Sequence, residues 1–182
     1  TVNLPQAAGI NNVEWDAVEL PSQFMENWCF HKNTLLNIAK HYKTGEKLSD
    51  ENFDKLLKNR TFNCGMATLR QIHFAITDLR LHSNIDQNKG KTSDEIRRKI
   101  AEQTTVIQPI QEDQFLCCFS HIFAGGYSAG YYSYKWAEVL SADAFSMFEE
   151  ADLENTKNLK LIGKKFRDCL LYTSPSPRDF QV

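Results

Sequence analysis

The sequence lacks several features that would define whole classes of protein. Its 182 residues contain no apolar run long enough to cross a bilayer, and no signal peptide opens the chain, so we expect no membrane partner. The 21 basic and 23 acidic residues leave a net charge of −2, which gives no reason to expect nucleic acid as a partner. Internal repeats and alternating strand and helix patterns are also missing, which argues against a parallel β-α fold.

The cysteines show no pattern of pairing. Five are present, an odd number, and no two form a Cys-x-x-Cys pair. The adjacent residues Cys117 and Cys118 are typical of buried thiols rather than of a disulfide or a metal site. We therefore expect a reducing, cytoplasmic compartment.

What the sequence does contain is a series of helical patterns. Hydrophobic residues make up 42% of the chain and charged residues 24%, which is typical of one ordinary globular domain. Apolar spacing and capping residues predict helices at 9–28, 33–42, 49–58, 64–81, 92–105, 128–150 and from 155 onward. We expect residues 106–109 to be extended and residues 114–123 to form a short strand or a buried loop. The predicted fold class is all-α, with little or no β structure.

Three of these helices have an apolar stripe that we expect to face the core. The stripe residues step by three or four positions: Met66, Leu69, Ile72 or His73, Ile76 and Leu79; then Tyr131, Tyr134 or Lys135, Val139 and Phe145; and finally Leu159, Ile162 and Phe166.

The predicted helix at 9–28 has four carboxylates among its apolar residues: Glu14, Asp16, Glu19 and Glu26. We expect a cap at Asn11 or Asn12 and a kink or interruption at Pro21. Glu19 would share a face with Trp15, and Glu26 would lie two turns further along. A buried carboxylate needs a cation, a hydrogen-bond network or a metal. Simple exposure or pairing with an arginine is the alternative.

Residues 121–136 combine a histidine, glycines and tyrosines. The Gly-Gly pair at 125–126 indicates a loop that leads into a helix, with tyrosines that pack on the core. No Gly-Lys-Ser/Thr follows, so a phosphate-binding loop is not expected. Tyr127 and Tyr134 are seven residues apart and can share a helical face if the helix begins early enough.

Residues 9–28, with Val-Glu-Leu-Pro-Ser-Gln at 18–23, resemble a segment of the oligopeptidase A and thimet oligopeptidase family of zinc peptidases. That segment follows the family's His-Glu-x-x-His helix, and the resemblance extends at intervals to about Asp168. It implies the helical C-terminal part of a zincin-type catalytic domain, one zinc ion, and hydrolysis of short peptides by zinc-activated water. By this resemblance Glu19 is the third zinc ligand. Asp16 and Glu26 are candidates for orienting the histidine ligands, with simple salt bridges as the alternative.

The second segment resembles the family's substrate-binding stretch. The resemblance implies that His121, Tyr127 and Tyr134 bind the peptide and stabilise the oxyanion, for which tyrosine hydroxyls are suitable neutral donors. Tyr131 is a further candidate for contact with the peptide. Gly125 and Gly126, together with Gly130, would let the segment move over the substrate. We expect Glu19, His121, Tyr127 and Tyr134 to line one cleft.

The His-Glu-x-x-His motif itself is absent, because no two of the five histidines flank a glutamate at that spacing. The chain also begins at Thr1. We therefore expect residues 1–168 to be part of a catalytic domain that is inactive alone and monomeric when complete. The other histidines, His31, His41, His73 and His82, are expected at the surface or at helix ends. The rival interpretation is a non-catalytic helical interaction module derived from such a fold.

Residues 169–182 differ from the rest of the chain. The run Cys-Leu-Leu-Tyr-Thr-Ser-Pro-Ser-Pro-Arg-Asp resembles the conceptual translation of a transposon-type sequencing adapter. Serine and proline replace the helical pattern there. We expect a non-native tail on which no core depends.

Overall fold

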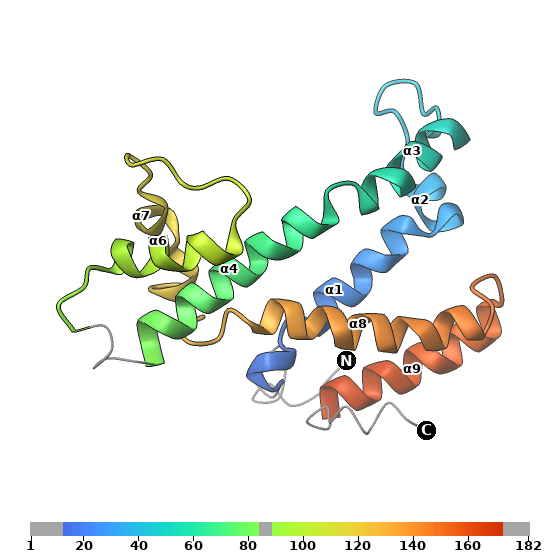
Figure 1. The fold of residues 1–182 in the computed structure, drawn as a ribbon. Coiled ribbons are helices and arrows are strands. Elements are labelled where there is room, and N and C mark those ends of the chain that lie inside the picture. The colour runs from blue at the N-terminus through green and yellow to red at the C-terminus, as the bar shows by residue number, and fades with distance from the viewer. Residues whose placement is uncertain (1–12, 84–88, 173–182) are drawn as a thin grey trace. The chain divides into compact units, whose positions relative to one another are not determined.

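The computed structural model describes residues 13–83 and 89–172, which form helices joined by turns and loops (Figure 1). The α-helices are α1 (Leu20–Asn27), α2 (Lys32–Ile38), α3 (Asp50–Thr61), α4 (Cys64–Ser83), α6 (Ser93–Thr104), α7 (Phe115–Cys118), α8 (Ser133–Glu150) and α9 (Thr156–Tyr172). Single turns of 3-10 helix occur at Trp15–Ala17, Trp28–Phe30 and Ser120–Ile122. These described ranges contain no β-strand, only an isolated bridge between Lys40 and Lys47, so the all-α prediction is confirmed.

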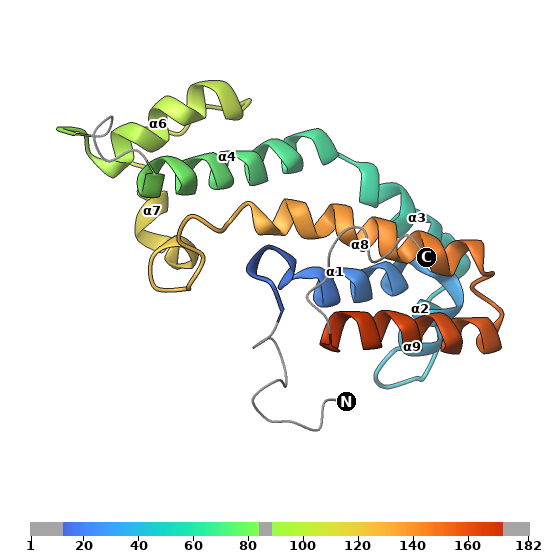
Figure 2. The same cartoon turned by 90° about the horizontal axis from the view of Figure 1, so that it is seen from below.

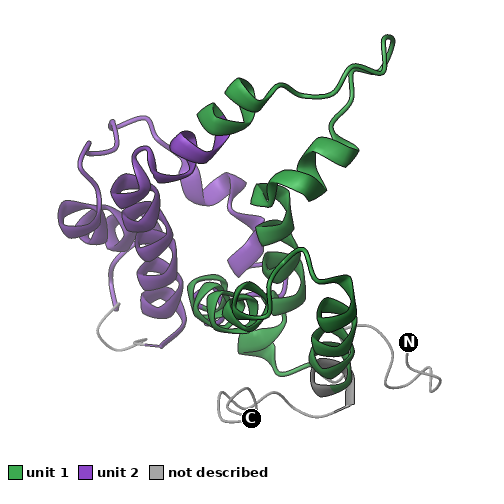
Figure 3. Cartoon of the chain, turned by 90° about the vertical axis from the view of Figure 1, so that its right-hand side faces the viewer, with its two compact units in different colours: residues 1–55, 133–182 green, residues 56–132 purple. Residues whose placement is uncertain are grey.

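The chain divides into two compact units, coloured separately in Figure 3. The first unit combines residues 1–55 with residues 133–182, and the second consists of residues 56–132. Within the described residues, none of the helices has both the length and the apolar character needed to cross a membrane.

The first unit is built on α1, α8 and α9, which lie side by side in Figures 1 and 2. Phe24 on α1 is at the centre of its core, with its ring 5.1 Å from that of Phe148 on α8 and 4.2 Å from that of Phe166 on α9. Apolar residues from the three helices and from the 3-10 turns that flank α1 complete the cluster: Ala17, Leu20, Leu140, Ala144, Phe145, Trp28, Leu159 and Ile162. The predicted core stripe of the last helix is thereby confirmed.

The second unit packs α4 against α6 and α7. Its aromatic centre is Phe74 on α4, which stacks on Phe115 at 4.8 Å and lies 5.0 Å from Phe119. The predicted cap of α6, at Thr92 or Ser93, is Thr92, whose hydroxyl accepts from the Glu95 amide while the Glu95 carboxylate accepts from the Thr92 amide.

The predicted helix at 9–28, which we expected to be kinked or interrupted at Pro21, is wrong in its start. A 3-10 turn comes first, and α1 begins only at Leu20, with Pro21 in its first turn. Proline is favoured there because it has no amide hydrogen to leave unpaired, so Pro21 begins this helix instead of kinking it. Trp15 and Glu19 therefore do not lie on one α-helix. The predicted cap at Asn11 or Asn12 lies outside the described residues.

Two predicted stripes also differ from the observed buried faces. On α4 the buried residues are His73, Phe74, Thr77 and Asp78, whereas Met66, Ile72, Ile76 and Leu79 of the predicted stripe are exposed. On α8 the predicted Val139 is 57% exposed, and the buried face contains Ala137, Leu140, Ser141, Ala144, Phe145 and Phe148. On α4, hydrogen bonds to His73 and Asp78 help to select the buried face, which apolar spacing alone does not reveal. On α8 the buried residues do recur at three- and four-residue spacing, in a different register from the predicted Val139.

Three further expectations are corrected. Residues 114–123 form the helical turns of α7 and Ser120–Ile122 instead of a strand, because Phe115 and Phe119 turn back onto Phe74. Cys117 and Cys118 are free thiols as expected, but they are exposed and not buried. The α9 helix continues to Tyr172, four residues into the tail that we expected to lack a helical pattern. The rest of that tail lies outside the described residues.

Candidate active site

Glu19 is half-buried and occupies the position just before the first turn of α1. The Ser22 hydroxyl bonds to the Glu19 carbonyl oxygen at 2.9 Å and lies 3.1 Å from its Oε2 atom. The Gln23 amide nitrogen also donates to the Glu19 carbonyl at 3.0 Å. The Pro-Ser-Gln run therefore builds the turn that holds the predicted metal ligand.

The amide side chain of Gln23 links this turn to α8. Its Nε2 atom donates to the carbonyl oxygen of Tyr134, in the first turn of α8, at 2.9 Å. Further along, the Asn27 side chain donates to the Ser141 hydroxyl at 3.0 Å. Contacts advance in the same direction on both helices, so α1 and α8 run parallel and their first turns lie together. Glu19 and Tyr134 are therefore on adjoining helix starts, about 115 residues apart in sequence.

Sequence reasoning missed Gln23, although the Pro-Ser-Gln run marked its position. A glutamine on a helix is common enough that only its partner, the Tyr134 carbonyl, reveals what it does. Of the other acids in this segment, Asp16 is half-buried in the 3-10 turn and Glu26 is exposed in the last turn of α1. That these two residues orient the histidine ligands stays a prediction.

His121 and Tyr127 belong to the second unit, where they lie close together. Their ring centroids are 6.2 Å apart, and the Tyr127 amide donates to the His121 carbonyl at 2.9 Å. His121 is exposed and Tyr127 is half-buried. Because α8 begins only at Ser133, Tyr127 precedes the helix and does not share a helical face with Tyr134. A cleft shared by Glu19, His121, Tyr127 and Tyr134 stays a prediction.

The glycines of this segment have a demonstrable packing role. A Cβ atom on Gly125 would lie 2.7 Å from the Cα of His121 and 3.0 Å from its carbonyl oxygen, both of which are backbone atoms. Gly126 has a φ of 85°, which side chains disfavour. The Gly125 amide donates to the Ser120 carbonyl at 2.8 Å. The glycines thus close a tight turn just after His121. That they let the segment move over a substrate stays a prediction.

Tyr131 is buried, with 8% of its surface exposed, and its hydroxyl donates to the Gln71 side chain at 3.1 Å. A contact between this hydroxyl and a peptide would require that bond to open.

The remaining histidines divide between surface and core. His31 bonds to Thr34 and Glu154, and His41 bonds to Thr44 in an exposed turn. His73 departs from the surface expectation, since it is only 5% exposed and its Nδ1 atom lies 2.8 Å from the Thr104 hydroxyl. Burial, and then the neighbouring Arg97 charge, lower the pKa of His73 below its usual value.

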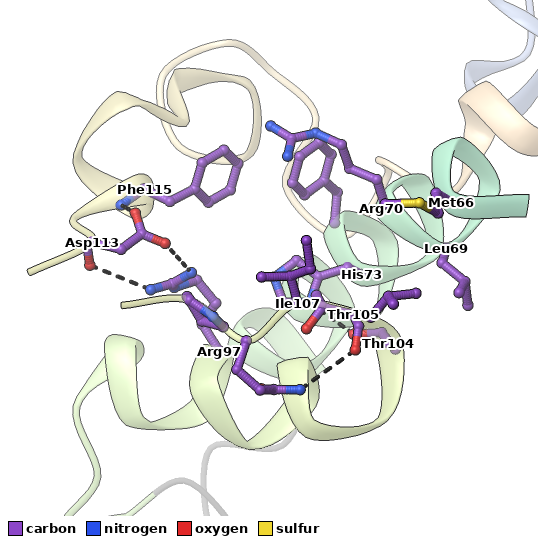
Figure 4. A pocket seen from close by; sticks show the side chains of 14 residues that line it. Met66, Leu69, Arg70, His73, Arg97, Thr104, Thr105, Ile107, Asp113 and Phe115 are labelled. Atoms are coloured by element: carbon purple, nitrogen blue, oxygen red, sulfur yellow. Dashed lines mark hydrogen bonds and ion pairs between the residues drawn. The ribbon is translucent and has the colours of Figure 1, made fainter. Parts of the chain in front are cut away.

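His73 also lines a cavity of about 450 Å³ in the second unit, shown in Figure 4. Arg97 at its wall is paired with Asp113 at 3.0 Å and with Asp94 at 2.9 Å. None of the residues predicted for catalysis or metal binding lines this cavity. Within the described part of the chain, no three His, Cys, Asp or Glu side chains gather as a metal site by themselves.

Comparison with known proteins identifies the family. A model of peptidase family M3 matches residues 1–175. The chain belongs to peptidase family M3. It is 58% identical over 164 residues to the probable cytosolic oligopeptidase A of Arabidopsis thaliana, a match that covers 90% of this chain and 23% of that protein. It is 48% identical over 181 residues to oligopeptidase A of Haemophilus influenzae, covering 100% of this chain and 26% of the relative.

The dipeptidyl carboxypeptidase of Escherichia coli is more distant, at 32% identity over 164 residues, with 88% of this chain and 23% of that protein covered. These M3 matches confirm the resemblance drawn from residues 9–28. The chain spans about a quarter of the length of these relatives. Because the family match runs to residue 175, a non-native tail from residue 169 stays a prediction.

Proposed function

We propose that residues 1–168 are part of the catalytic domain of a zinc oligopeptidase whose complete form hydrolyses short peptides. The observation that most supports this is the 2.9 Å bond from Gln23 to the Tyr134 carbonyl, which joins the turn after Glu19 to the start of α8. A hydrolase of this kind needs a metal ligand and an oxyanion donor near one reacting carbonyl. The adjoining starts of α1 and α8, which carry Glu19 and Tyr134, suit that need.

The residues present fit one part of a zinc site. Catalytic zinc takes three protein ligands and keeps one position open, and Glu19 offers a half-buried carboxylate close to the Ser22 hydroxyl. When bound, zinc supplies a Lewis acid that polarises the peptide carbonyl and lowers the pKa of water. In this proposal two histidines and a glutamate base come from outside residues 1–182, and Asp16 and Glu26 orient the histidines.

His121, Tyr127 and Tyr134 are proposed to bind the peptide and to donate hydrogen bonds to the oxyanion. A tyrosine hydroxyl donates without adding a charge, and one such donor contributes about 3 kcal/mol to transition-state binding. Gly125 and Gly126 are proposed to present backbone to the peptide. Tyr131 is a weaker candidate, because its hydroxyl is bonded to Gln71.

We further propose a monomeric, cytoplasmic enzyme. Two Arabidopsis relatives at the same 58% identity are named as cytosolic and as organellar, so names alone do not select a compartment. Support for a reducing compartment comes from Cys29, Cys64, Cys117 and Cys118, which are free thiols.

The test uses the complete protein with single substitutions. We expect Glu19→Gln to lower zinc affinity by more than the roughly 10- to 100-fold that changes to residues behind the ligands cause. Tyr134→Phe should keep zinc and lower kcat by about 10²- to 10³-fold, as loss of an oxyanion donor does. Bound zinc is measured after dialysis against graded chelator, and kcat with a quenched peptide.

The matched control is Glu14→Gln, an exposed glutamate five residues before Glu19, which should keep both zinc and activity. The non-catalytic interaction module predicts that Glu19→Gln and Glu14→Gln behave alike, and that result would remove the site assignment. The 182-residue chain alone should neither hydrolyse peptides nor retain zinc, since one carboxylate does not make a closed site.

A further inference from the structure

Asp78 on α4 is completely buried, with 0% of its surface exposed, and has no part in the peptidase chemistry described above. Both of its carboxylate oxygens accept backbone hydrogen bonds from residues 121–132, which we call the tyrosine segment. Its Oδ1 accepts from the Ala129 amide at 2.8 Å, and its Oδ2 accepts from the Tyr131 amide at 2.9 Å. Bonds to a carboxylate are stronger than bonds between neutral groups, so this pair is a firm attachment.

Two other residues of α4 reinforce the attachment. The Nδ1 atom of His82 lies 2.8 Å from Oδ1 of Asp78 and 2.9 Å from its carbonyl oxygen. Because the carbonyl only accepts, Nδ1 carries the proton and donates to Asp78. Gln71, two turns earlier on the same helix, accepts from the Tyr131 hydroxyl at 3.1 Å. The helix α4 thus holds the segment in two ways: Asp78 bonds to its backbone amides, and Gln71 bonds to the Tyr131 side chain.

The held backbone leads directly to the proposed catalytic side chains. Between the two amides bonded to Asp78, the Gly130 amide donates to the Tyr127 carbonyl at 2.9 Å, and the Tyr127 amide donates to the His121 carbonyl at 2.9 Å. Hydrogen bonds therefore run from Asp78 through residues 129–131 to Tyr127 and His121, all within the second unit.

The segment needs such an attachment. Ala129 has a φ of 56°, a left-handed conformation that residues with a Cβ seldom adopt, and Gly126 and Gly130 add backbone freedom on either side. Such a conformation persists only where its surroundings impose it. The bond from Ala129 to Asp78 is made at this left-handed residue.

We propose that Asp78 is a positioning residue for the peptidase reaction, which fixes the backbone at 129–131 and thereby sets where the side chains of Tyr127 and His121 lie. The role rests on the proposed function, because it matters to catalysis only if those side chains contact the peptide. This role would explain why the fully buried Asp78 carboxylate accepts from two loop amides that lie more than fifty residues away in sequence.

The test uses the complete, zinc-loaded protein with Asp78→Asn, which keeps the shape of the side chain but replaces one accepting oxygen with a donor. We expect faster amide hydrogen exchange in peptides covering residues 127–132, unchanged zinc content, and a kcat lowered roughly 10- to 100-fold with a smaller change in KM, as expected when a reacting group is misplaced. Asp54→Asn, an exposed aspartate on α3, is the control and should change none of these. Gln71→Met, which removes the acceptor for Tyr131, should act in the same direction with a smaller effect, and decides the matter if Asp78→Asn does not fold.

Unchanged exchange at residues 127–132 in Asp78→Asn would overturn the attachment itself. A second outcome is that Tyr127→Phe lowers kcat, whereas Asp78→Asn shows faster exchange but a wild-type kcat. That result would overturn the positioning role and leave the proposed function standing. If Tyr127→Phe has no effect on kcat while Glu19→Gln loses zinc, the role of the tyrosine segment fails, and the positioning role fails with it.

Discussion

The two units of the molecule bury different kinds of side chain. At the centre of the first unit, Phe24 packs among Trp28, Phe145, Phe148 and Phe166, and the only buried polar side chains described there are Ser133 and Ser141. In the second unit a comparable aromatic centre is surrounded by buried His73, Asp78 and Arg97. All the buried acidic, basic and histidine side chains among the described residues lie in this second unit.

The two units therefore hold their candidate site residues in place in different ways. Apolar packing in the first unit aligns whole helices, and the Gln23 side chain joins the starts of α1 and α8. The tyrosine segment of the second unit is irregular chain, and directional hydrogen bonds from the buried Asp78 hold it in addition to the packing of Tyr131 on Phe74 and Phe119. Substitutions in the two units should therefore have different effects on stability and on local hydrogen exchange.

The largest effect is expected at the aromatic centre of the first unit. Phe24→Ala should lower the free energy of unfolding by about 3–5 kcal/mol, because it leaves a cavity between Phe148 and Phe166. Chemical denaturation of the complete protein, with hydrogen exchange read on peptides from α1, α8 and α9, measures it. The neighbouring Met25→Ala, at a residue 60% exposed, should change stability by no more than about 0.5 kcal/mol.

A smaller effect is expected from the buried arginine of the second unit. Arg97→Met keeps the apolar volume but removes the bonds to Asp94 and Asp113, and should cost about 2 kcal/mol. Both carboxylates retain access to water, which keeps the loss below that of a fully buried pair. Faster exchange should appear in α6 and in residues 106–113. Lys99→Met, on the exposed side of the same helix, serves as the control, and an equal loss there would show that the pairing contributes nothing.

The smallest effect is a pH dependence confined to the second unit. Burial lowers the pKa of His73 in the folded chain, so the unfolded chain takes up a proton first as the pH falls below the ordinary value of 6.5. Stability is then complete above that value and declines below it, until the folded chain is protonated as well. The denaturation midpoint of α4 and α6 should fall between about pH 7.5 and about pH 5.5 in the wild type, and less in His73→Gln. The exposed His41→Gln should retain the full decline.

The sequence predicted the elements of each unit better than it predicted their faces. The cap at Thr92 and the stripe of Leu159, Ile162 and Phe166 were sufficient to locate α6 and the core face of α9, because local chemistry decides both. On α4 the predicted stripe included His73 only as an alternative to Ile72 and missed Asp78. These two residues are tolerated inside only through partners distant in sequence, Thr104 and the amides of Ala129 and Tyr131.

At the candidate site, too, the sequence predicted some features and missed others. Resemblance selected Glu19, His121, Tyr127 and Tyr134, but the spacing argument that put the two tyrosines on one helical face failed once α8 began at Ser133. The start of α1 was misplaced because Pro21 was treated as a breaker and not as a first-turn residue. Gln23 and Asp78 were beyond prediction, because their roles depend on contacts with chain more than fifty residues away.

The parallel course of α1 and α8 has an electrostatic consequence. Every helix carries a partial positive charge at its amino end, and here two such ends adjoin, joined by the Gln23 bond. Their fields add on the side where Glu19 lies, and each end favours a nearby negative charge by about 0.3–1 kcal/mol. The two adjoining helix ends would thus favour a negative charge placed beside them.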